Sequence, residues 1–473
     1  MSPLIISIAV CTVGISPVDS ITWQLPSLAF ENPAVKQWML PASHSTVRVE
    51  GDYIHTPDGV VDILGNGERR WAADAGSYMK TGGSTVWGAA AYSSGKETGR
   101  IRMENSEPEM VYPYFNVDTL GGEMNMEHYS FGGGYASASG RWAWGLEASY
   151  KAGLYYRSVD PRPRNTTGRL EINGGGAFRL WRDYHVGVSL EYMKYKQSSD
   201  IDFKSQMGIE KIYHTTGLGH HYVRFAGTGY STAYSGHSFD VAATLYPSSG
   251  RGFSATAAYS RYTVSKILTD LNKLPLARAT EHRLRAQVTY IPQGSFGLDL
   301  NMEVWRRRGF ENIFGDASSG VYPMIGSVHR YSHTGTTLTA GMLRQWHPRA
   351  ATLVGLRLTA GYARNELVYL NPAQTRRADA ATGSADMWIT MPVATRWRLM
   401  FGADYNGYLP CDTRKMQNDI YGLTVNSFGV RTSVSVAVTR RIALRLSLKY
   451  TRLTFSRALD DANAATGAIA VIF

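Results

Sequence analysis

From about residue 124 to its end, the sequence repeats stretches of roughly ten residues in which every second residue is apolar. In RIALRLSLKY (441–450), apolar side chains occupy the even-numbered positions, and polar or small side chains occupy the odd-numbered ones. A helix of period 3.6 cannot separate its side chains in this way, whereas a β-strand places successive residues on opposite faces. Eleven further segments share the pattern: 141–150, 168–178, 184–193, 238–246, 281–290, 296–304, 337–343, 354–362, 383–391, 396–405 and 431–438. The sequence therefore predicts many β-strands, each with an apolar and a polar face.

The connections between these strands alternate between short and long. The short ones cover 137–140, 247–252, 291–295, 347–350, 392–395 and 439–441, and the long ones cover roughly 152–167, 197–235, 263–279, 308–335, 364–382 and 407–426. Transmembrane β-barrels have short periplasmic turns and long extracellular loops. The apolar faces also carry aromatic residues that suit the two girdles of such a barrel: Tyr150, Tyr192, Tyr246, Tyr290, Tyr362, Trp397, Tyr405 and Tyr450. A soluble β-sandwich alternates too, but such folds rarely sustain two-faced hairpins over some 350 residues.

The number of strands follows from the hairpins. Those with short turns give fourteen strands between about 125 and 455, and the last strand makes fifteen. Both ends of such a barrel lie on the periplasmic side, so the number must be even. Residues 84–92 supply an earlier strand, and 45–53 with about 70–79 supply one more hairpin. We predict an all-β fold, a closed antiparallel up-and-down transmembrane β-barrel of 18 strands, with 16 and then 14 as alternatives, because an open sheet edge would leave backbone groups unpaired in the hydrocarbon.

The amino-terminal region predicts export. The apolar run PLIISIAVCTVGIS (3–16) is shorter than the roughly 18 to 20 residues that cross a bilayer as a helix. We interpret residues 1–20 as a signal peptide, 21–44 as a periplasmic or plug segment, and 45–473 as the barrel. Cys411 is then alone in the mature chain, which excludes a disulfide framework.

The final segment, TGAIAVIF (466–473), ends on a bare aromatic residue and places Ile469, Val471 and Phe473 on one face. With the signal-like start and the two-faced strands, it resembles Gram-negative outer-membrane β-barrel proteins. The resemblance implies an outer-membrane location, and it implies that these three residues are the signal read by the barrel-assembly machinery. More narrowly, PYFNVDTLGGEMNMEHYSFGGGYAS, YYRSVDPRPRN and YHTTGLGHHYVRF look like an uncharacterised family of outer-membrane barrels of Bacteroidota, which offers no catalytic residue to transfer. ENPAV (31–35) is similar to the Asn-Pro-Ala near the plugging N-terminal segment of long-chain fatty acid transporters.

Basic residues outnumber acidic ones, giving a formal net charge of +11, and they are spread along the chain. This distribution argues against a nucleic-acid partner and suits a surface that faces lipid headgroups and lipopolysaccharide. The polar strand faces carry both signs of charge, which need water or partners, because an Arg or Lys facing lipid costs about 2 to 4 kcal/mol at the midplane. The charges expected to line the lumen are Arg285, Arg357, Arg398, Arg431, Arg445, Lys449, Asp240, Asp299, Glu303, Asp386 and Asp404. They form either an internal lattice of salt bridges or a constriction that lines a solute path.

Two loop segments hold further candidates. In YYRSVDPRPRN, two prolines stiffen a loop whose charged residues form either a structural latch or a contact for a ligand or lipopolysaccharide: Arg157, Asp160, Arg162 and Arg164. In IYHTTGLGHHYVRF, three histidines are weak candidates for a metal or haem, because their spacing is not diagnostic: His214, His220 and His221. In EMNMEHYS, a strand points Glu127 away from His128 and Ser130, so these residues cannot form a hydrolytic relay.

These patterns predict a channel or transporter-like barrel for a small solute, or the membrane partner of an uptake complex with a surface lipoprotein or uptake receptor. Two alternatives stay open: a non-transporting scaffold or assembly partner, and passage of hydrophobic compounds as in fatty acid transporters. We expect no enzymatic activity, no cofactor and no resident metal.

Overall fold

A computed structural model gives the structure of this chain. It describes residues 25, 27–39, 42–56, 65–100, 105–118, 120–160, 162–204, 212–225, 231–317, 321–349, 351–412, 425–439, 442–455 and 461–473. The predicted signal peptide lies outside the described residues.

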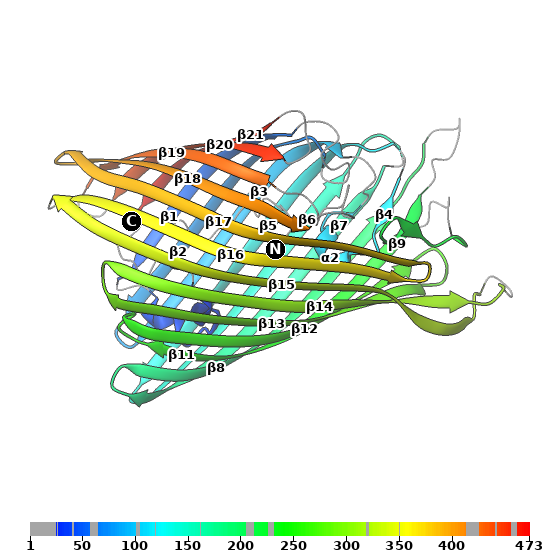
Figure 1. Ribbon diagram of the computed structural model, residues 1–473, viewed down its shortest axis with the longest axis horizontal. Helices are drawn as coiled ribbons and strands as arrows, with labels where there is room; N and C mark the ends of the chain where they lie inside the picture. Colours follow the sequence, from blue (N-terminus) through cyan, green and yellow to red (C-terminus); the bar gives the residue numbers. More distant parts are fainter. Residues whose placement is uncertain are drawn as a thin grey trace.

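Eighteen long strands form one sheet (Figure 1). They are β1 (His44–His55), β2 (Gly67–Thr81), β3 (Ser84–Arg100), β5 (Gly122–Ser139), β6 (Trp142–Tyr156), β7 (Arg164–Trp181), β8 (Tyr184–Asp200), β11 (Thr232–Pro247), β12 (Gly252–Leu268), β13 (Leu274–Gln293), β14 (Phe296–Phe314), β15 (Met324–Arg349), β16 (Thr352–Leu370), β17 (Ala373–Ala394), β18 (Trp397–Asp412), β19 (Val425–Ala437), β20 (Ala443–Phe455) and β21 (Ala462–Ile472). Each pairs antiparallel with the next, and β1 closes the ring on β21, from Thr46 opposite Ile472 to His55 opposite Asn463. The predicted closed barrel of 18 strands is confirmed.

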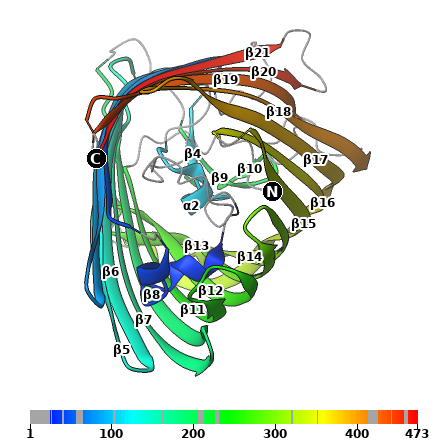
Figure 2. The same ribbon diagram turned by 90° about the vertical axis from the view of Figure 1, so that its left-hand side faces the viewer.

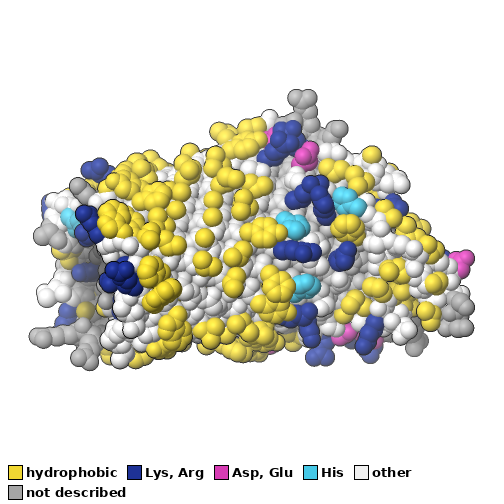
Figure 3. Space-filling view, turned by 90° about the horizontal axis from the view of Figure 1, so that it is seen from below, with side chains coloured by type: hydrophobic (Ala, Val, Ile, Leu, Met, Phe, Trp, Pro, Cys, Tyr) yellow, Lys and Arg dark blue, Asp and Glu magenta, His cyan; other side chains and the backbone are white. Residues whose placement is uncertain are grey.

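The alternation in the sequence becomes an apolar outer belt. Leu446 and Leu448 on β20 and Ile469 on β21 expose 48%, 54% and 60% of their surface on the outside of the barrel. Figure 3 shows hydrophobic side chains spread over most of the outer face that it views. A closed barrel with such a belt satisfies its backbone internally and presents hydrocarbon to lipid. The chain is therefore an integral outer-membrane β-barrel.

The carboxyl end is part of this wall. Phe473 follows β21, donates its N–H to the Ser45 carbonyl oxygen at 2.9 Å, and accepts from the Ser45 N–H at 3.3 Å. Its side chain is exposed, as is that of Ile469, while Val471 is half-buried. The assembly role of these residues stays a prediction.

One end of the barrel has short turns, and we call it the turn end; the other is the loop end. Two of the predicted long loops at the loop end are wrong. Residues 263–279 continue β12 and β13 around a turn at 269–273, and 364–382 continue β16 and β17 around a turn at 371–372. The sequence pattern did not reveal these extensions because their apolar residues face inward instead of outward. Val264 and Leu268 are buried on the inside, where other segments fill the lumen.

The remaining elements lie inside the ring (Figure 2). They are the 3₁₀ helices η1 (Leu28–Glu31) and η2 (Lys36–Trp38), the short helix α2 (Pro108–Val111), and a small sheet of β4 (Asn116–Val117), β9 (Tyr213–Gly217) and β10 (His220–His221). Among the described residues, no helix is long and apolar enough to span a bilayer.

Candidate functional site

The N-terminal insert, residues 27–39, packs against the inside of β6–β8 near the turn end. Asn32 is 1% exposed, and it holds a tight turn by accepting from the Ala34 N–H at 2.9 Å. Its amide nitrogen donates to the Gly176 carbonyl at 3.3 Å. The insert approaches closely because inward positions are glycine: a Cβ on Gly175 would lie 2.1 Å from Asn32 Oδ1, and one on Gly145 would lie 2.5 Å from the Pro33 backbone.

Polar contacts hold the insert on both flanks. The Arg285 guanidinium on β13 donates to both Glu31 carboxylate oxygens, at 2.6 and 2.8 Å. Lys36 forms an ion pair with Glu147 on β6. The Tyr78 hydroxyl on β2 donates to the Lys36 carbonyl oxygen at 2.8 Å. The insert is thus fixed to strands on three parts of the wall.

A second insertion, the plug, comprises residues 105–118 and 212–225 and fills the loop-end half of the lumen. Its Tyr114 and Phe115 are 2% and 5% exposed. They belong to an aromatic cluster with inward-facing tyrosines of the wall: Tyr195, Tyr234, Tyr262, Tyr331 and Tyr369. Buried wall cations also donate to plug carbonyls, including Lys266 Nζ to the Phe115 oxygen at 3.1 Å.

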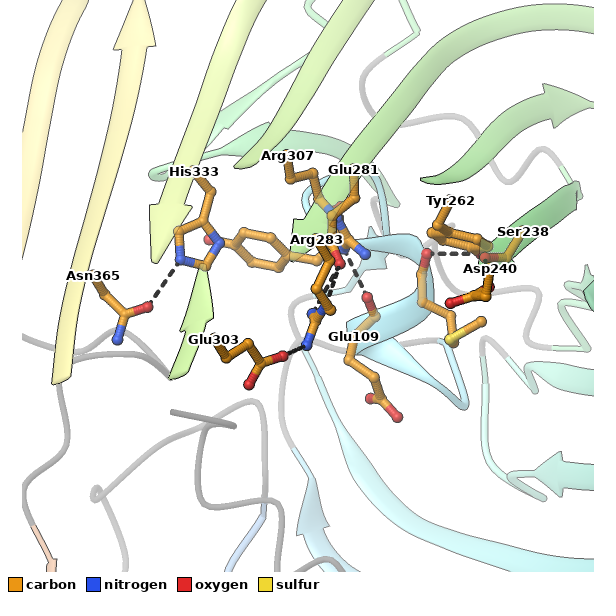
Figure 4. A network of polar contacts seen from close by, with 12 residues as sticks. Glu109, Ser238, Asp240, Tyr262, Glu281, Arg283, Glu303, Arg307, His333 and Asn365 are labelled. Atoms are coloured by element: carbon orange, nitrogen blue, oxygen red, sulfur yellow. Dashed lines mark hydrogen bonds and ion pairs between the residues drawn. The ribbon is translucent and has the colours of Figure 1, made fainter. Parts of the chain in front are cut away.

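Next to the plug, toward the turn end, lies a network of charged residues on β13 and β14 (Figure 4). Arg307 donates to the Glu109 carbonyl oxygen in the plug at 2.7 Å, and its Nε lies 2.9 Å from Glu281. Glu281 also accepts from Arg283 at 2.8 Å, and Arg283 pairs with Glu303. This network joins the plug to the wall.

A row of charged residues, which we call the charge belt, runs along the inner wall from β14 to β21 and continues through β1 to β2. Asp404 on β18 lies 3.4 Å from Lys449 on β20 and 3.5 Å from Arg431 on β19. Arg431 also donates to Asp386 on β17 at 2.6 Å. The register places these groups at one level, because Asp386 faces Asp404 and Arg431 faces Lys449 directly across the sheet.

The belt continues in both directions. On one side Arg357 lies 3.6 Å from Asp299. On the other, Thr466 faces Lys449 across the sheet and donates to Asp52 at 2.8 Å. Asp52 also accepts from Arg70 Nε at 3.1 Å. Charged groups of both signs therefore line this part of the lumen.

The same wall lines two cavities. The larger, about 1660 Å³, has a lining that includes Asp52, Arg70, Trp388, Arg431 and Lys449. The smaller, about 780 Å³, lies at the turn end.

A model for a family of unknown function, DUF6850, matches residues 36–468. The chain belongs to this family. No curated protein matches the sequence. The narrower expectation of a Bacteroidota family stays a prediction.

Solved structures are similar to this DUF6850 chain only loosely. The ferric enterobactin receptor of Pseudomonas aeruginosa is 8% identical, with a TM-score of 0.41 over 91% of this chain and 80% of that one. The ferric preacinetobactin receptor of Acinetobacter baumannii is 8% identical, with a TM-score of 0.45 over the same shares. The copper transporter OprC is 8% identical, with a TM-score of 0.43 over 91% and 80%. TM-scores of this size describe a loose likeness between large barrels, which does not extend to function.

The structure places the predicted lumen charges of this DUF6850 chain in several groups. Asp299, Arg357, Asp386, Asp404, Arg431 and Lys449 lie in the charge belt, whereas Arg285 holds the N-terminal insert and Glu303 joins the network next to the plug. Arg398 and Arg445 line the turn-end cavity, and Asp240 accepts from Ser238 at 2.6 Å. The sequence reasoning missed Glu31, Asp52 and Arg70. The alternation in STVRVEGDY (45–53) carried a signal for Asp52, because Asp52 shares a face with Arg48 and Glu50.

The predicted loop group does not form one site. Arg157 is 4% exposed and pairs with Asp118 of the plug. Asp160 pairs instead with Arg162 at 2.9 Å and accepts from the Lys204 N–H at 3.0 Å. Arg164 begins β7 and is exposed. Arg157 therefore anchors the β6–β7 connection to the plug, which sets it apart from Asp160, Arg162 and Arg164.

The three histidines also separate. His214 is fully buried in the plug, where its Nδ1 lies 3.0 Å from Asn116 Oδ1. Burial lowers the pKa of His214 well below its usual value, with a smaller effect from Lys266, so the ring is neutral. His220 stacks on Tyr369 with ring centres 4.4 Å apart, and His221 packs on Tyr213. Within the described ranges, no group of three His, Cys, Asp or Glu side chains is arranged to hold a metal ion.

Proposed function

We propose that this barrel passes a small polar solute across the outer membrane, along the wall formed by β16–β21 and β1–β3. One observation carries the proposal. The N-terminal insert and the plug make most of their contacts with β5–β15, apart from those to Tyr78 on β2 and Tyr369 on β16, while the rest of the opposite wall borders a cavity of about 1660 Å³. This volume exceeds the roughly 300 to 1000 Å³ of a site for a drug-sized molecule, so it has room for a hydrated solute.

The two cavities suggest the direction of the path. On β18, Arg398–Met400 border the turn-end cavity, while Phe401–Ala403 border the larger one. The same succession holds on β19 and β20, so the cavities follow one another along the strands. The path would run from the loop end past the charge belt to the turn end.

The belt suggests the chemistry of the solute. It carries charges of both signs, with Asp386 beside Asp404 and Arg431 beside Lys449, and rings of fixed charge set the selectivity of membrane pores. Asp404 lies 3.4 Å from Lys449 and 3.5 Å from Arg431, and both contacts are longer than the 2.6 Å bond from Arg431 to Asp386, so Asp404 and Lys449 can exchange partners with a solute. A solute that carries both a donor and an acceptor, such as a small zwitterion or sugar, matches this surface better than an apolar one.

Ion selectivity in planar bilayers tests the proposal. Wild-type protein should conduct, and Asp404→Asn should shift the reversal potential in a salt gradient toward anion selectivity. Lys449→Gln should shift it toward cations. Glu366→Gln is the matched control, because Glu366 pairs with Arg364 on the outside of β16 and should leave selectivity unchanged. A wild-type barrel without conductance, or belt variants that match the control, would refute a solute path along this wall.

The other candidate functions have less support. The N-terminal insert lies beside a cavity near Leu25, Phe30 and Tyr246, but that cavity has only about 20 Å³, too small for a fatty acid. The scaffold reading predicts no conductance together with co-purification of a defined partner from native membranes. A surface lipoprotein or uptake receptor that co-purifies with a conducting barrel would instead support the uptake complex.

A further inference from the structure

The outer face of β12–β14 carries a concentrated group of basic residues near the loop end. We call it the basic patch: Arg261, Arg278, His282, Arg306 and Arg308. Arg261 faces His282 across β12 and β13, and His282 faces Arg306 across β13 and β14. All five side chains are exposed. Figure 3 shows a band of basic and histidine side chains beside the hydrophobic surface on this side of the barrel.

The patch has no acidic counterpart on its own surface. Across the outer faces of β11–β14, the described residues include no carboxylate, and no described carboxylate forms an ion pair with the four arginines. At the same height on the outer faces of β16 and β17, the arginines have acidic partners: Arg364 lies 3.5 Å from Glu366, and Arg377 pairs with Asp379. Arg261 and Arg306 lie at one level on either side of His282, and like charges held this close on one face repel each other. The patch is therefore an arrangement that an external anion would stabilise.

Its place on the barrel indicates where this anion comes from. On β12, Tyr259 lies two residues from Arg261 toward the turn end. It is 41% exposed, and its hydroxyl contacts His282 Nδ1 at 2.7 Å. Beside it, Phe239 on β11 and Tyr192 on β8 pack with their ring centres 5.1 Å apart and their planes tilted by 47°. Exposed aromatic rings of this kind mark the boundary between hydrocarbon and headgroups. The basic patch thus lies at headgroup height on the loop end, which faces outward in transmembrane barrels.

The wall behind the patch is held firmly. Tyr262 and Arg307, on the inner face at the same level, are 8% and 7% exposed. The Tyr262 hydroxyl donates to the Met110 carbonyl oxygen of the plug at 3.2 Å. Arg278 is steadied on the outside by the Phe310 ring, 5.5 Å from its guanidinium. The arginines therefore project from a surface with little freedom to rearrange.

We propose that the basic patch binds the phosphate groups of a phosphorylated glycolipid headgroup in the outer leaflet. Guanidinium groups bind phosphate oxygens in pairs, and Arg306 and Arg308 are spaced about 7 Å apart along one face of β14, so two phosphates can be held at once. The acyl chains would lie on the apolar surface below, over Leu284, Leu300 and Met302, which are exposed on the same strands.

The test titrates detergent-solubilised full-length barrel with fluorescent lipid A and follows anisotropy. Each arginine near an anionic headgroup contributes about a fivefold gain in binding. The double variant Arg261→Gln/Arg306→Gln should therefore bind bisphosphorylated lipid A about thirtyfold more weakly than wild type. The matched control Arg364→Gln/Arg377→Gln removes two arginines that have acidic partners and should bind as wild type does. Arg308→Gln alone should lose about fivefold, which keeps the test available if the double variant does not fold on a heat-modifiability gel.

Two competitors separate the sources of phosphate. Fully dephosphorylated lipid A should bind wild type about as weakly as bisphosphorylated lipid A binds the double variant, and inorganic phosphate should not displace the labelled lipid at millimolar concentration. Equal affinity of wild type and the patch variants overturns the proposal. So does equal binding of the dephosphorylated lipid, which would leave apolar contact alone, and displacement by inorganic phosphate would indicate a site for free phosphate.

Discussion

Replacing Gly175 by Ala should release the N-terminal insert while leaving the barrel closed. The new Cβ would lie 2.1 Å from Asn32 Oδ1 and 3.0 Å from Pro33 Cδ, so Asn32 must move away from the wall. It would then lose the bond that it donates to Gly176 and the bond that it accepts from Ala34. Two such hydrogen bonds stabilise the docked state by about 2 kcal/mol. The docked population should fall about thirtyfold relative to the undocked one.

Hydrogen exchange measures this change directly. Three amides of the insert are protected when it is docked, since Val35 donates to the Asn32 carbonyl, Trp38 to the Val35 carbonyl and Met39 to the Lys36 carbonyl, each at 3.0 Å. A peptide from this region should exchange about thirtyfold faster in the Gly175 variant.

Gly174→Ala is the matched control. A Cβ at Gly174 meets only Leu146 Cδ1, at 3.8 Å on the outer face, and should change nothing in the insert. Equal exchange in wild type, Gly175→Ala and Gly174→Ala would refute the argument that the inward glycines form the docking site.

Three further outcomes follow from the same structure. Leu446→Arg, on the lipid face of β20, should destabilise the barrel by about 2 to 4 kcal/mol in urea unfolding from liposomes, whereas Ser447→Arg, which points into the lumen, should cost far less. Docking of the plug should weaken as the pH falls below about 6.5, because buried His214 is neutral and the undocked loop takes up a proton; hydrogen exchange of residues 213–217 should report this, and His214→Gln should remove the dependence. Phe473→Asp should sharply lower the amount of barrel in outer-membrane fractions, and normal levels would contradict the assembly signal.

The sequence predicted the wall of this barrel well because lipid imposes a rule on every strand that it touches. A residue that faces hydrocarbon must be apolar, so every membrane-spanning strand shows apolar residues at every second position. The rule fails where the inner face of a strand packs against protein instead of water. In 262–268, Tyr262, Val264 and Leu268 face the plug and are buried, so the apolar face is the inner one. Reading that stretch as a loop followed from applying the membrane rule beyond the membrane.

The candidate site was predicted as a set of residues and not as an arrangement. Strand parity was enough to expect Asp386, Asp404, Arg431 and Lys449 on the inner face. Their pairing depends on the stagger between neighbouring strands, which places Asp404 on β18 within 3.5 Å of cations on β19 and β20, while Asp386 faces Asp404 from β17 on the other side. Alternation alone does not determine the stagger. The contact of Arg285 with Glu31 was harder still to predict, because the two residues are 254 positions apart and Glu31 lies in a segment outside the barrel strands.

Among the described residues, the inserted segments pack on one side of the lumen and a cavity borders the other, and the inward positions explain this division. Near the turn end, β6 and β7 present Ala143, Gly145 and Gly175 inward, and these small residues let the insert approach the backbone and exclude water. On β18 and β20 the inward positions include Asp404 and Lys449, whose desolvation by a packed segment would cost several kcal/mol for each ion. A segment entering the barrel is therefore drawn to one wall and repelled from the other. The cavity beside the charged wall is the expected consequence of this asymmetry.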